Sequence, residues 1–112
     1  RVYLVSSAPA EIVDPLAEHV GAHGAIATRA EIDEHGRYTG EVAFYAAGPA
    51  KADAIRALAA REGIDLTASY AYSDSATDLP MLETVGHPVA VCPDFRLKQT
   101  ALQHDWAILD LK

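Results

Sequence analysis

Segments of strand type alternate along this chain with segments of helical type, and that alternation limits the possible folds more than any other feature. The strand-type segments are short, rich in β-branched and aromatic residues, and bounded by turn residues. They cover residues 2–5, 68–72, 88–91 and 106–111. Strands that alternate with helices predict an α/β domain with a mainly parallel sheet, in which ligands gather at the carboxyl ends of the strands.

Helices are expected between the strands, together with one β-hairpin. The clearest helix begins at Pro49 and ends at Gly63, because proline suits a first helical position and glycine a helix end. Further helices are expected over residues 78–85 and 94–104. Residues 25–44 are typical of a hairpin, since apolar and β-branched residues flank a polar turn.

The first strand is expected to end in a turn over residues 6–9, with a helical segment somewhere within residues 10–20. Three apolar residues recur there at four-residue spacing, namely Ile12, Leu16 and Val20. Pro15 would remove an interior hydrogen bond, at about 3 kcal/mol, unless Asp14 caps a helix that starts at Pro15.

Composition excludes several classes of protein. The 112 residues include 16 Asp or Glu and 9 Lys or Arg, and the formal net charge of −7 disfavours a broad contact with nucleic acid or anionic lipid. No apolar run approaches the roughly 20 residues that a membrane helix needs. The single cysteine, Cys92, excludes an internal disulfide and points to a reducing compartment, so we expect a cytoplasmic protein.

Because an apolar run follows Arg1 directly, we expect the true beginning of the chain to lie upstream.

Polar side chains stand where this architecture places ligands. Ser6 and Ser7 end the first strand, Asp74 ends the second, Asp78 follows four residues later, and Lys51 lies in the first turn of the clearest helix. Hydroxyls, an ammonium and paired carboxylates suit a phosphate group and a divalent cation, because Mg²⁺ takes carboxylate oxygens and bridges to phosphate.

Lys51 is the most informative of these residues. A cation in a first helical turn opposes the helix dipole, by on the order of 0.3–1 kcal/mol, unless an anion lies nearby. Lys51 precedes Ile55 by four residues, so its ammonium is expected to emerge near the strand ends. The alternative is a solvated surface lysine.

Simpler structural roles are open for the other residues. Thr77 could be a helix N-cap, with Asp78 favouring the helix dipole and Asp74 closing a turn. The Ser6 hydroxyl could satisfy local backbone groups, or it could cup an anion together with backbone N–H groups. No histidine is placed to activate Cys92, which favours a buried or half-buried structural cysteine. The five histidines are not expected to bind metal.

Taken together, these residues resemble the haloacid dehalogenase superfamily, and within it the phosphoserine-phosphatase-like branch. Residues 4–7 (LVSS) are similar to its second motif, a hydrophobic strand that ends in Ser or Thr. Residues 48–51 (GPAK), followed by an amphipathic helix, are similar to the third motif. Residues 72–82 (YSDSATDLPML), with two acids four apart, are similar to the fourth, and residues 86–91 (GHPVAV) follow as they do in that branch.

The resemblance implies a Rossmann-like, three-layer α/β/α core with a β-hairpin. It also implies a Mg²⁺-dependent phosphomonoester hydrolase that acts on a small phosphorylated substrate through an aspartyl-phosphate. Ser6, together with Ser7, would contact the substrate phosphoryl group, and Lys51 would stabilise the charge of that group and of the nucleophile. Asp74 would ligate Mg²⁺, and Asp78 would ligate the metal or orient its site.

Two parts of the family's pattern have no counterpart in this sequence. The first motif, Asp-x-Asp, carries the nucleophile and the general acid/base, and a helical cap lies between the first and second motifs. Cys92 also stands where relatives commonly have asparagine. We therefore expect this chain to be catalytically inactive on its own.

The missing nucleophile strand has a structural consequence. In the superfamily it lies between the strands of the second and fourth motifs, so unpaired edges are expected at residues 2–5 and 68–72. Exposed apolar edges invite pairing with another chain. We expect them to be covered by a missing amino-terminal segment or a second copy of the chain, or to close by collapse.

Two other functions stay open. The chain could be a non-catalytic binding or regulatory module that has kept a phosphate and metal pocket. An α/β response or nucleotide-binding domain without a family link is disfavoured, because no Gly-rich phosphate loop follows any strand. The phosphate ester itself is not identified by the sequence, since the cap largely sets substrate choice in the family.

Overall fold

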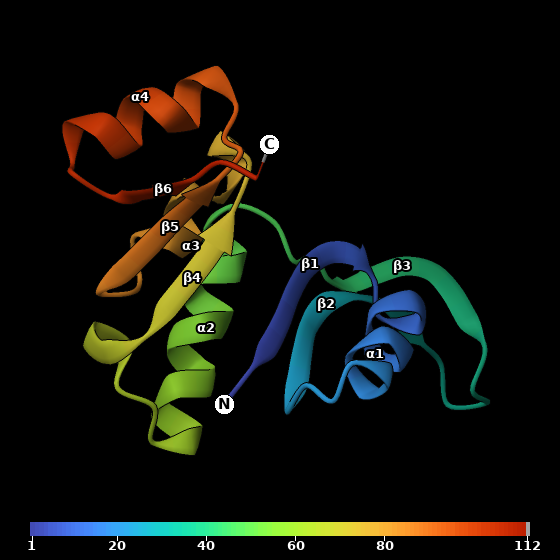
Figure 1. Cartoon of the computed structure of the whole chain (residues 1–112). Helices are drawn as coiled ribbons and strands as arrows, with labels where there is room; N and C mark the ends of the chain where they lie inside the picture. Colours follow the sequence, from blue (N-terminus) through green and yellow to red (C-terminus); the bar gives the residue numbers. More distant parts are fainter. Residues whose placement is uncertain (112) are drawn as a thin grey trace. The chain divides into compact units, whose positions relative to one another are not determined.

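Two three-stranded sheets organise the residues that the structure describes (Figure 1). The structure is a computed structural model and describes residues 1–111. The first sheet belongs to a compact unit formed by residues 1–51, and the second belongs to a unit that begins at Ala52. Within residues 1–111, no helix is both long and apolar enough to cross a membrane.

The first unit is a parallel strand pair extended by a hairpin. Its elements are β1 (Tyr3–Pro9), α1 (Ala10–His19), β2 (Gly24–Ile32) and β3 (Tyr38–Phe44). β1 runs parallel to β2, and β2 pairs with β3 in antiparallel orientation, which confirms the expected hairpin. Helix α1 packs against β1 and β2 through a small core in which Ala10, Val13 and Ala27 are buried.

β1 is longer than the sequence predicts. The turn expected over residues 6–9 is wrong, because the strand continues to Pro9 across an irregularity in its pairing with β2. Val5 pairs with Ile26 and Pro9 with Thr28, so four residues of β1 span two of β2. Pro9 has extended backbone angles (φ −61°, ψ 143°) and directly precedes α1.

Helix α1 forms where it was expected but presents another face to the core. It begins at Ala10 and contains Pro15, so a helix starting at Pro15 is excluded. Its buried residues are Ala10, Val13 and Ala17. The apolar residues whose spacing predicted the helix are exposed, with exposed fractions of 62%, 49% and 58% for Ile12, Leu16 and Val20.

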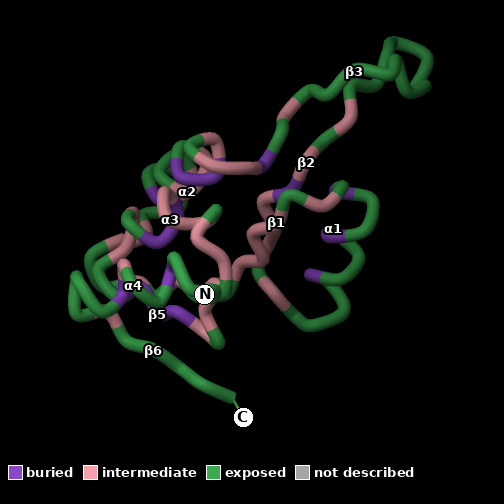
Figure 2. Tube along the Cα trace, turned by 90° about the horizontal axis from the view of Figure 1, so that it is seen from above, coloured by how far each residue is buried: buried purple, intermediate pink, exposed green. Residues whose placement is uncertain are grey.

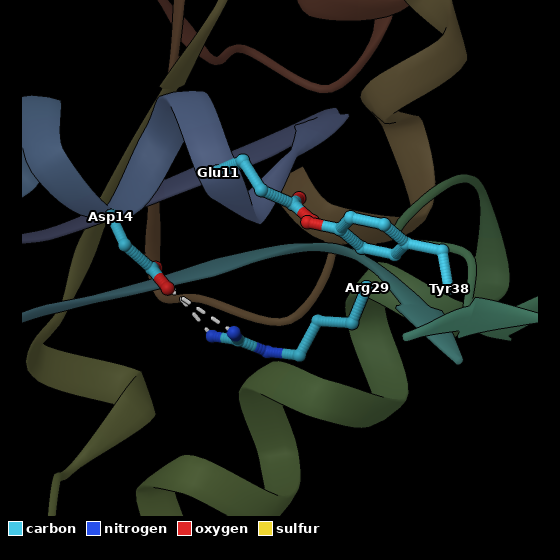
Figure 3. Close-up of polar contacts among 4 residues, drawn as sticks. All are labelled: Glu11, Asp14, Arg29 and Tyr38. Carbon is cyan, nitrogen blue, oxygen red and sulfur yellow. Dashed lines mark hydrogen bonds and ion pairs between the residues drawn. The ribbon is translucent and has the colours of Figure 1, made fainter. Parts of the chain in front are cut away.

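Polar contacts join α1 to the hairpin (Figure 3). The Tyr38 hydroxyl donates a hydrogen bond of 2.6 Å to Oε2 of Glu11, and the Arg29 guanidinium lies 3.1 Å from Oδ2 of Asp14. The Tyr38 hydrogen bond lowers the pKa of Glu11, and the same bond raises the pKa of Tyr38. These contacts fix the hairpin to the helix that directly precedes it in the sequence.

The second unit is an all-parallel sheet in the order β4-β5-β6. Helix α2 (Pro49–Glu62) leads into it, confirming the clearest expected helix. The elements that follow are η1 (Leu66–Ala68), β4 (Tyr70–Ser73), η2 (Ala76–Asp78), α3 (Leu79–Leu82), β5 (His87–Val91), α4 (Phe95–Gln103) and β6 (Ala107–Leu109). Figure 2 shows buried residues along the central strand β5, where Val89 and Ala90 are buried.

Three boundaries in this unit differ from the sequence prediction. β4 begins at Tyr70, because Asp65 caps a short 3₁₀ turn that takes up residues 66–68. The helix expected over residues 78–85 ends at Leu82, and the last strand is confined to Ala107–Leu109. The fold class itself is confirmed: both units are of α/β type, and their pairings are parallel apart from the hairpin.

Both strands expected to have open edges lie at the edges of their sheets. β1 is the first strand of the order β1-β2-β3, and β4 is the first strand of the order β4-β5-β6. Among the described residues each has a single strand partner. A strand edge presents unpaired N–H and C=O groups, so each of these strands can accept another strand.

Candidate functional site

The carboxylate loop, defined as residues 74–78, follows β4 at the carboxyl end of the parallel sheet. Ser73, the last residue of β4, fixes one of its two acids. The Ser73 hydroxyl accepts a hydrogen bond of 3.2 Å from the backbone N–H of Ser75 and donates one of 2.7 Å to Oδ2 of Asp78. A hydroxyl that accepts one bond and donates another has its orientation set, so it holds the Asp78 carboxylate in place.

Asp74 is the exposed acid of the loop. Its backbone carbonyl accepts a hydrogen bond of 2.9 Å from the backbone N–H of Asp94, which immediately precedes α4. Among residues 1–111, the Asp74 carboxylate forms no hydrogen bond or ion pair. Its main chain is therefore anchored while its side chain faces solvent.

Asp94 connects the carboxylate loop to α4. Its Oδ1 accepts from the backbone N–H of Leu97 at 2.8 Å, which caps the helix, and its Oδ2 accepts from the backbone N–H of Ala76 at 3.0 Å. These backbone hydrogen bonds, from Leu97 first and Ala76 second, lower the pKa of Asp94. The ionised carboxylate is thus the form that holds the loop.

The capping role expected for Thr77 belongs to another residue. Ser75 is the N-cap of η2, and its hydroxyl accepts from the backbone N–H of Thr77 at 3.2 Å. Asp78 stands at the N-cap position of α3, yet its side chain makes no capping hydrogen bond. The Asp78 carboxylate is therefore directed to Ser73 rather than used to start a helix.

The donor set of the loop fits a magnesium ion that takes its other ligands from elsewhere. Asp74 and Asp78 supply carboxylate oxygens, and Mg²⁺ is commonly held by one or two carboxylates, with water and phosphate oxygens completing six positions. Among residues 1–111, no three His, Cys, Asp or Glu side chains are grouped so as to hold a metal ion. The chain thus offers a partial coordination shell rather than a closed cage.

Lys51 is buried, which contradicts its alternative interpretation as a solvated surface lysine. It is the third residue of α2 and exposes 7% of its surface. In the described part of the chain it is the one buried residue with a charged or polar side chain. A buried ammonium is stable only beside hydrogen-bond acceptors or negative charge, and in a first helical turn it opposes the helix dipole unless an anion lies nearby.

Ser6 and Ser7 lie near the end of β1. Ser6 is partly buried, and its hydroxyl accepts a hydrogen bond of 3.1 Å from the backbone N–H of Ala8. The local backbone role considered for Ser6 is therefore present. Because a hydroxyl that accepts one bond keeps its proton, Ser6 can still donate to an anion. Ser7 is exposed.

Cys92 differs from the expectation of a buried or half-buried residue. It is exposed, and its φ of 40° places it in the left-handed region. Its sulfur accepts a hydrogen bond of 3.2 Å from the backbone N–H of Leu111 and lies 3.9 Å from Oδ1 of Asp110. These contacts tie the turn after β5 to the segment after β6, and the burial prediction is wrong because this turn lies beyond the end of the sheet.

Of the candidate residues, the structure brings Asp74 and Asp78 together in one loop of the second unit. Ser6, Ser7 and Lys51 belong to the first unit. The sequence interpretation assigned no role to Ser73 or Asp94. A signal was available for Asp94, which follows the predicted strand over residues 88–91. The carboxyl ends of neighbouring parallel strands lie side by side, and the pairing of Ser73 in β4 with Ala90 in β5 brings the segments after these two strands together.

Comparisons with known proteins agree with the motifs. A family model described as haloacid dehalogenase-like hydrolase matches residues 1–83. The chain is 56% identical over 109 residues to the inhibition of morphological differentiation protein of Streptomyces azureus, covering 97% of this chain and 39% of that protein. It is also 56% identical over 108 residues to a probable phosphatase of Mycobacterium tuberculosis, covering 96% of this chain and 37% of that protein.

The solved structures give the same picture. The chain resembles a substrate-bound phosphoserine phosphatase with a TM-score of 0.72 and 30% sequence identity, over 96% of this chain and 50% of that one. It spans about two fifths of the length of the two curated relatives and half of this structural relative.

Proposed function

We propose that this chain, which belongs to the haloacid dehalogenase-like hydrolase family, is the cation- and phosphate-binding part of a cytoplasmic phosphomonoester hydrolase. The observation that carries the proposal is the carboxylate loop. Two acids follow a parallel strand, and one of them is held by the Ser73 hydroxyl at 2.7 Å. The burial of Lys51 and the likeness to a phosphoserine phosphatase support the same reaction class.

In the proposed reaction, an aspartate supplied from outside this chain attacks the phosphorus of a small phosphate ester. The bond between phosphorus and the ester oxygen breaks, and the departing alkoxide takes a proton from a general acid that is also supplied from outside. Water then attacks the phosphorus of the resulting aspartyl-phosphate, which releases inorganic phosphate and regenerates the carboxylate. Substrates of this class differ in the alcohol, so phosphoserine is one candidate among several.

The residues of this chain would provide positioning and charge neutralisation, on which phosphoryl transfer mainly depends. Asp74 and Asp78 would hold Mg²⁺, with Asp78 oriented by Ser73. When bound, Mg²⁺ supplies positive charge that neutralises phosphate oxygens. Ser6 would donate its hydroxyl proton to a phosphoryl oxygen, Ser7 would add a second hydroxyl, and the Lys51 ammonium would neutralise charge on the phosphoryl group and the nucleophile.

We further infer that the edges of β1 and β4 are covered in the working protein by an amino-terminal segment that contains the nucleophile strand. Both strands lie at sheet edges, and relatives are longer than this chain. A second copy of the chain is the alternative covering. Sedimentation of the isolated chain distinguishes them, because covering by a second copy requires a dimer.

The proposal is tested by phosphatase turnover of the isolated chain on an aryl phosphate with added Mg²⁺. We expect no turnover above that of a buffer control, because the nucleophile is not in this sequence. Robust turnover that Asp74→Asn abolishes would show that the nucleophile lies within these 112 residues and would overturn this division of roles.

One observation favours a second function, a non-catalytic regulatory module. The Streptomyces azureus relative is named for inhibition of morphological differentiation and not for a reaction. A regulatory module would bind phosphate and Mg²⁺ without turnover even when its amino-terminal segment is present. Turnover by the longer protein excludes this second function.

A further inference from the structure

We propose that Asp94 is a positioning residue that holds the carboxylate loop in the shape in which Asp74 and Asp78 take a divalent cation. This inference rests on the function proposed above, in which those two acids bind Mg²⁺. Asp94 itself is assigned no contact with the cation or the substrate.

The geometry of Asp94 carries the inference. Its Oδ2 accepts the Ala76 N–H at 3.0 Å, and its backbone N–H donates to the Asp74 carbonyl at 2.9 Å. Asp94 therefore holds the main chain of the loop on both sides of Ser75. The peptide group between Asp74 and Ser75 and the peptide group between Ser75 and Ala76 therefore cannot rotate without breaking one of these hydrogen bonds.

Helix capping alone does not explain this arrangement. One oxygen is enough to cap a helix, and Oδ1 of Asp94 does so by accepting the Leu97 N–H at 2.8 Å. Asp65 shows the simpler case, because its Oδ1 accepts both the N–H and the hydroxyl of Thr67, at 3.0 and 2.6 Å, within its own turn. Asp94 instead uses its second oxygen to bind a segment 18 residues away.

A cation site in this loop needs such support. The Asp78 carboxylate has Ser73 as a partner at 2.7 Å, whereas the Asp74 side chain is exposed, so its direction depends on its main chain. Residues that orient metal ligands without touching the metal typically change metal affinity by about 10- to 100-fold when they are replaced. Asp94 supplies that orientation for Asp74 through the backbone.

Two substitutions remove the same hydrogen bond from opposite ends. Asp94→Ser keeps an oxygen that can cap α4 but has no second oxygen for Ala76. Ala76→Pro removes the N–H of Ala76 and leaves Asp94 unchanged. Proline suits position 76 because it is the first residue of η2 and because Ser75, with φ −124° and ψ 140°, has the extended conformation favoured before proline. Asp65→Ser is the matched control, since it alters a capping aspartate that does not contact the carboxylate loop.

The experiment uses the 112-residue chain and Mn²⁺ alone as a paramagnetic probe for the cation site. The readouts are the broadening of the Asp74 and Asp78 amide signals by NMR and the hydrogen exchange of the Ala76 and Leu97 amides. In Asp94→Ser we expect faster exchange at Ala76, retained protection at Leu97, and a Mn²⁺ midpoint raised by about 10-fold. Ala76→Pro should raise the midpoint as well, and Asp65→Ser should leave it unchanged.

The outcomes separate this inference from the function on which it rests. If Mn²⁺ does not broaden the loop signals of the unsubstituted chain, the proposed cation site is wrong whatever Asp94 does. If the unsubstituted chain binds Mn²⁺ and either folded loop variant titrates with the same midpoint, Asp94 is only a helix cap and the inference is overturned. If Asp94→Ser does not fold, the Mn²⁺ midpoint of Ala76→Pro alone decides between these two outcomes.

Discussion

At the scale of single residues, the candidate site depends on two side chains that have no distinctive chemistry of their own. Ser73 fixes the carboxylate of Asp78, and Asp94 fixes the backbone of the carboxylate loop. The acids Asp74 and Asp78 were predictable because two carboxylates four residues apart form a recognisable pattern. Ser73 was not, because a serine at the end of a strand forms no recognisable pattern with an acid five residues later. For Asp94 the one available signal was its place after the neighbouring strand, because its bond to Ala76 joins segments 18 residues apart.

The Ser73 hydroxyl is open to a direct test. Ser73→Ala removes both the bond to Asp78 and the bond from the Ser75 N–H, so the Asp78 carboxylate loses the group that orients it. We expect the Mn²⁺ midpoint of the loop to rise by about 10-fold with the fold retained. Ser69→Ala is the control, since that hydroxyl donates only to the Asp65 carbonyl at 2.7 Å. An unchanged Mn²⁺ midpoint in Ser73→Ala would show that Asp78 is oriented without Ser73.

Gly86 is required by close packing of main chains rather than by an unusual backbone angle. A Cβ at this position would lie 1.8 Å from the backbone oxygen of Thr67, which cannot move away as a flexible side chain would. We expect Gly86→Ala to lower the free energy of unfolding by about 1–3 kcal/mol in urea denaturation. Gly24→Ala should have a smaller effect, because its Cβ would meet only the Tyr3 ring at 3.2 Å. Equal effects would argue against the close approach at Gly86.

At the scale of elements, the sequence predicted those that rest on strong local signals. The helix from Pro49 to Glu62 begins at proline and is followed by Gly63 with a φ of 66°. The helix α4 and the strand β5 were also placed correctly. Local periodicity failed for α1, where the helix is real but its outward face carries Ile12, Leu16 and Val20. The spacing of apolar residues identifies an apolar face of a helix, but it does not predict whether another part of the chain packs against that face.

The start of β4 was missed for a related reason. The apolar character of residues 68–72 predicted a strand, whereas the Asp65 carboxylate draws residues 66–68 into a 3₁₀ turn by accepting from Thr67. A side chain that bonds the backbone two residues on competes with strand pairing. The extension of β1 to Pro9 depends on its pairing with β2, which no local pattern encodes.

The contact between α1 and the hairpin predicts a pH dependence of stability. The pKa of Glu11 lies below its ordinary value of 4.5 and that of Tyr38 above its ordinary value of 10.0. The main cause of both shifts is the hydrogen bond between them, which favours the ionised form of Glu11 and the protonated form of Tyr38. The Glu11 contribution is present above pH 4.5 and is lost as the pH falls through its lowered pKa. The Tyr38 contribution is present below pH 10.0 and is lost as the pH rises through its raised pKa.

Tyr38→Phe removes this hydrogen bond. We expect it to lower the midpoint of thermal unfolding at pH 7 and to have little effect once Glu11 is protonated in acid. Tyr45→Phe, a change at another exposed tyrosine, is the control. A difference between Tyr38→Phe and the unsubstituted chain that stays constant from pH 7 into the acid range would contradict the role given to Glu11.

At the scale of the whole molecule, the chain carries part of the core of a haloacid dehalogenase-like hydrolase. The family match and the two edge strands agree with a core that receives a further strand. Two of the acids that contribute to the net charge of −7, Asp74 and Asp78, lie together in the carboxylate loop, where the proposal assigns them to a cation.

The most direct measurement is Mg²⁺-dependent phosphatase turnover of the chain after an amino-terminal segment bearing an Asp-x-Asp strand has been joined to it. We expect turnover of an aryl phosphate by the joined protein, none by the 112-residue chain alone, and loss of turnover on Asp74→Asn. Glu31→Gln, a change at an exposed acid of β2, should leave turnover intact. A folded joined protein that shows no turnover, or turnover that survives Asp74→Asn, would contradict the assignment of this chain as the cation-binding part of a phosphatase.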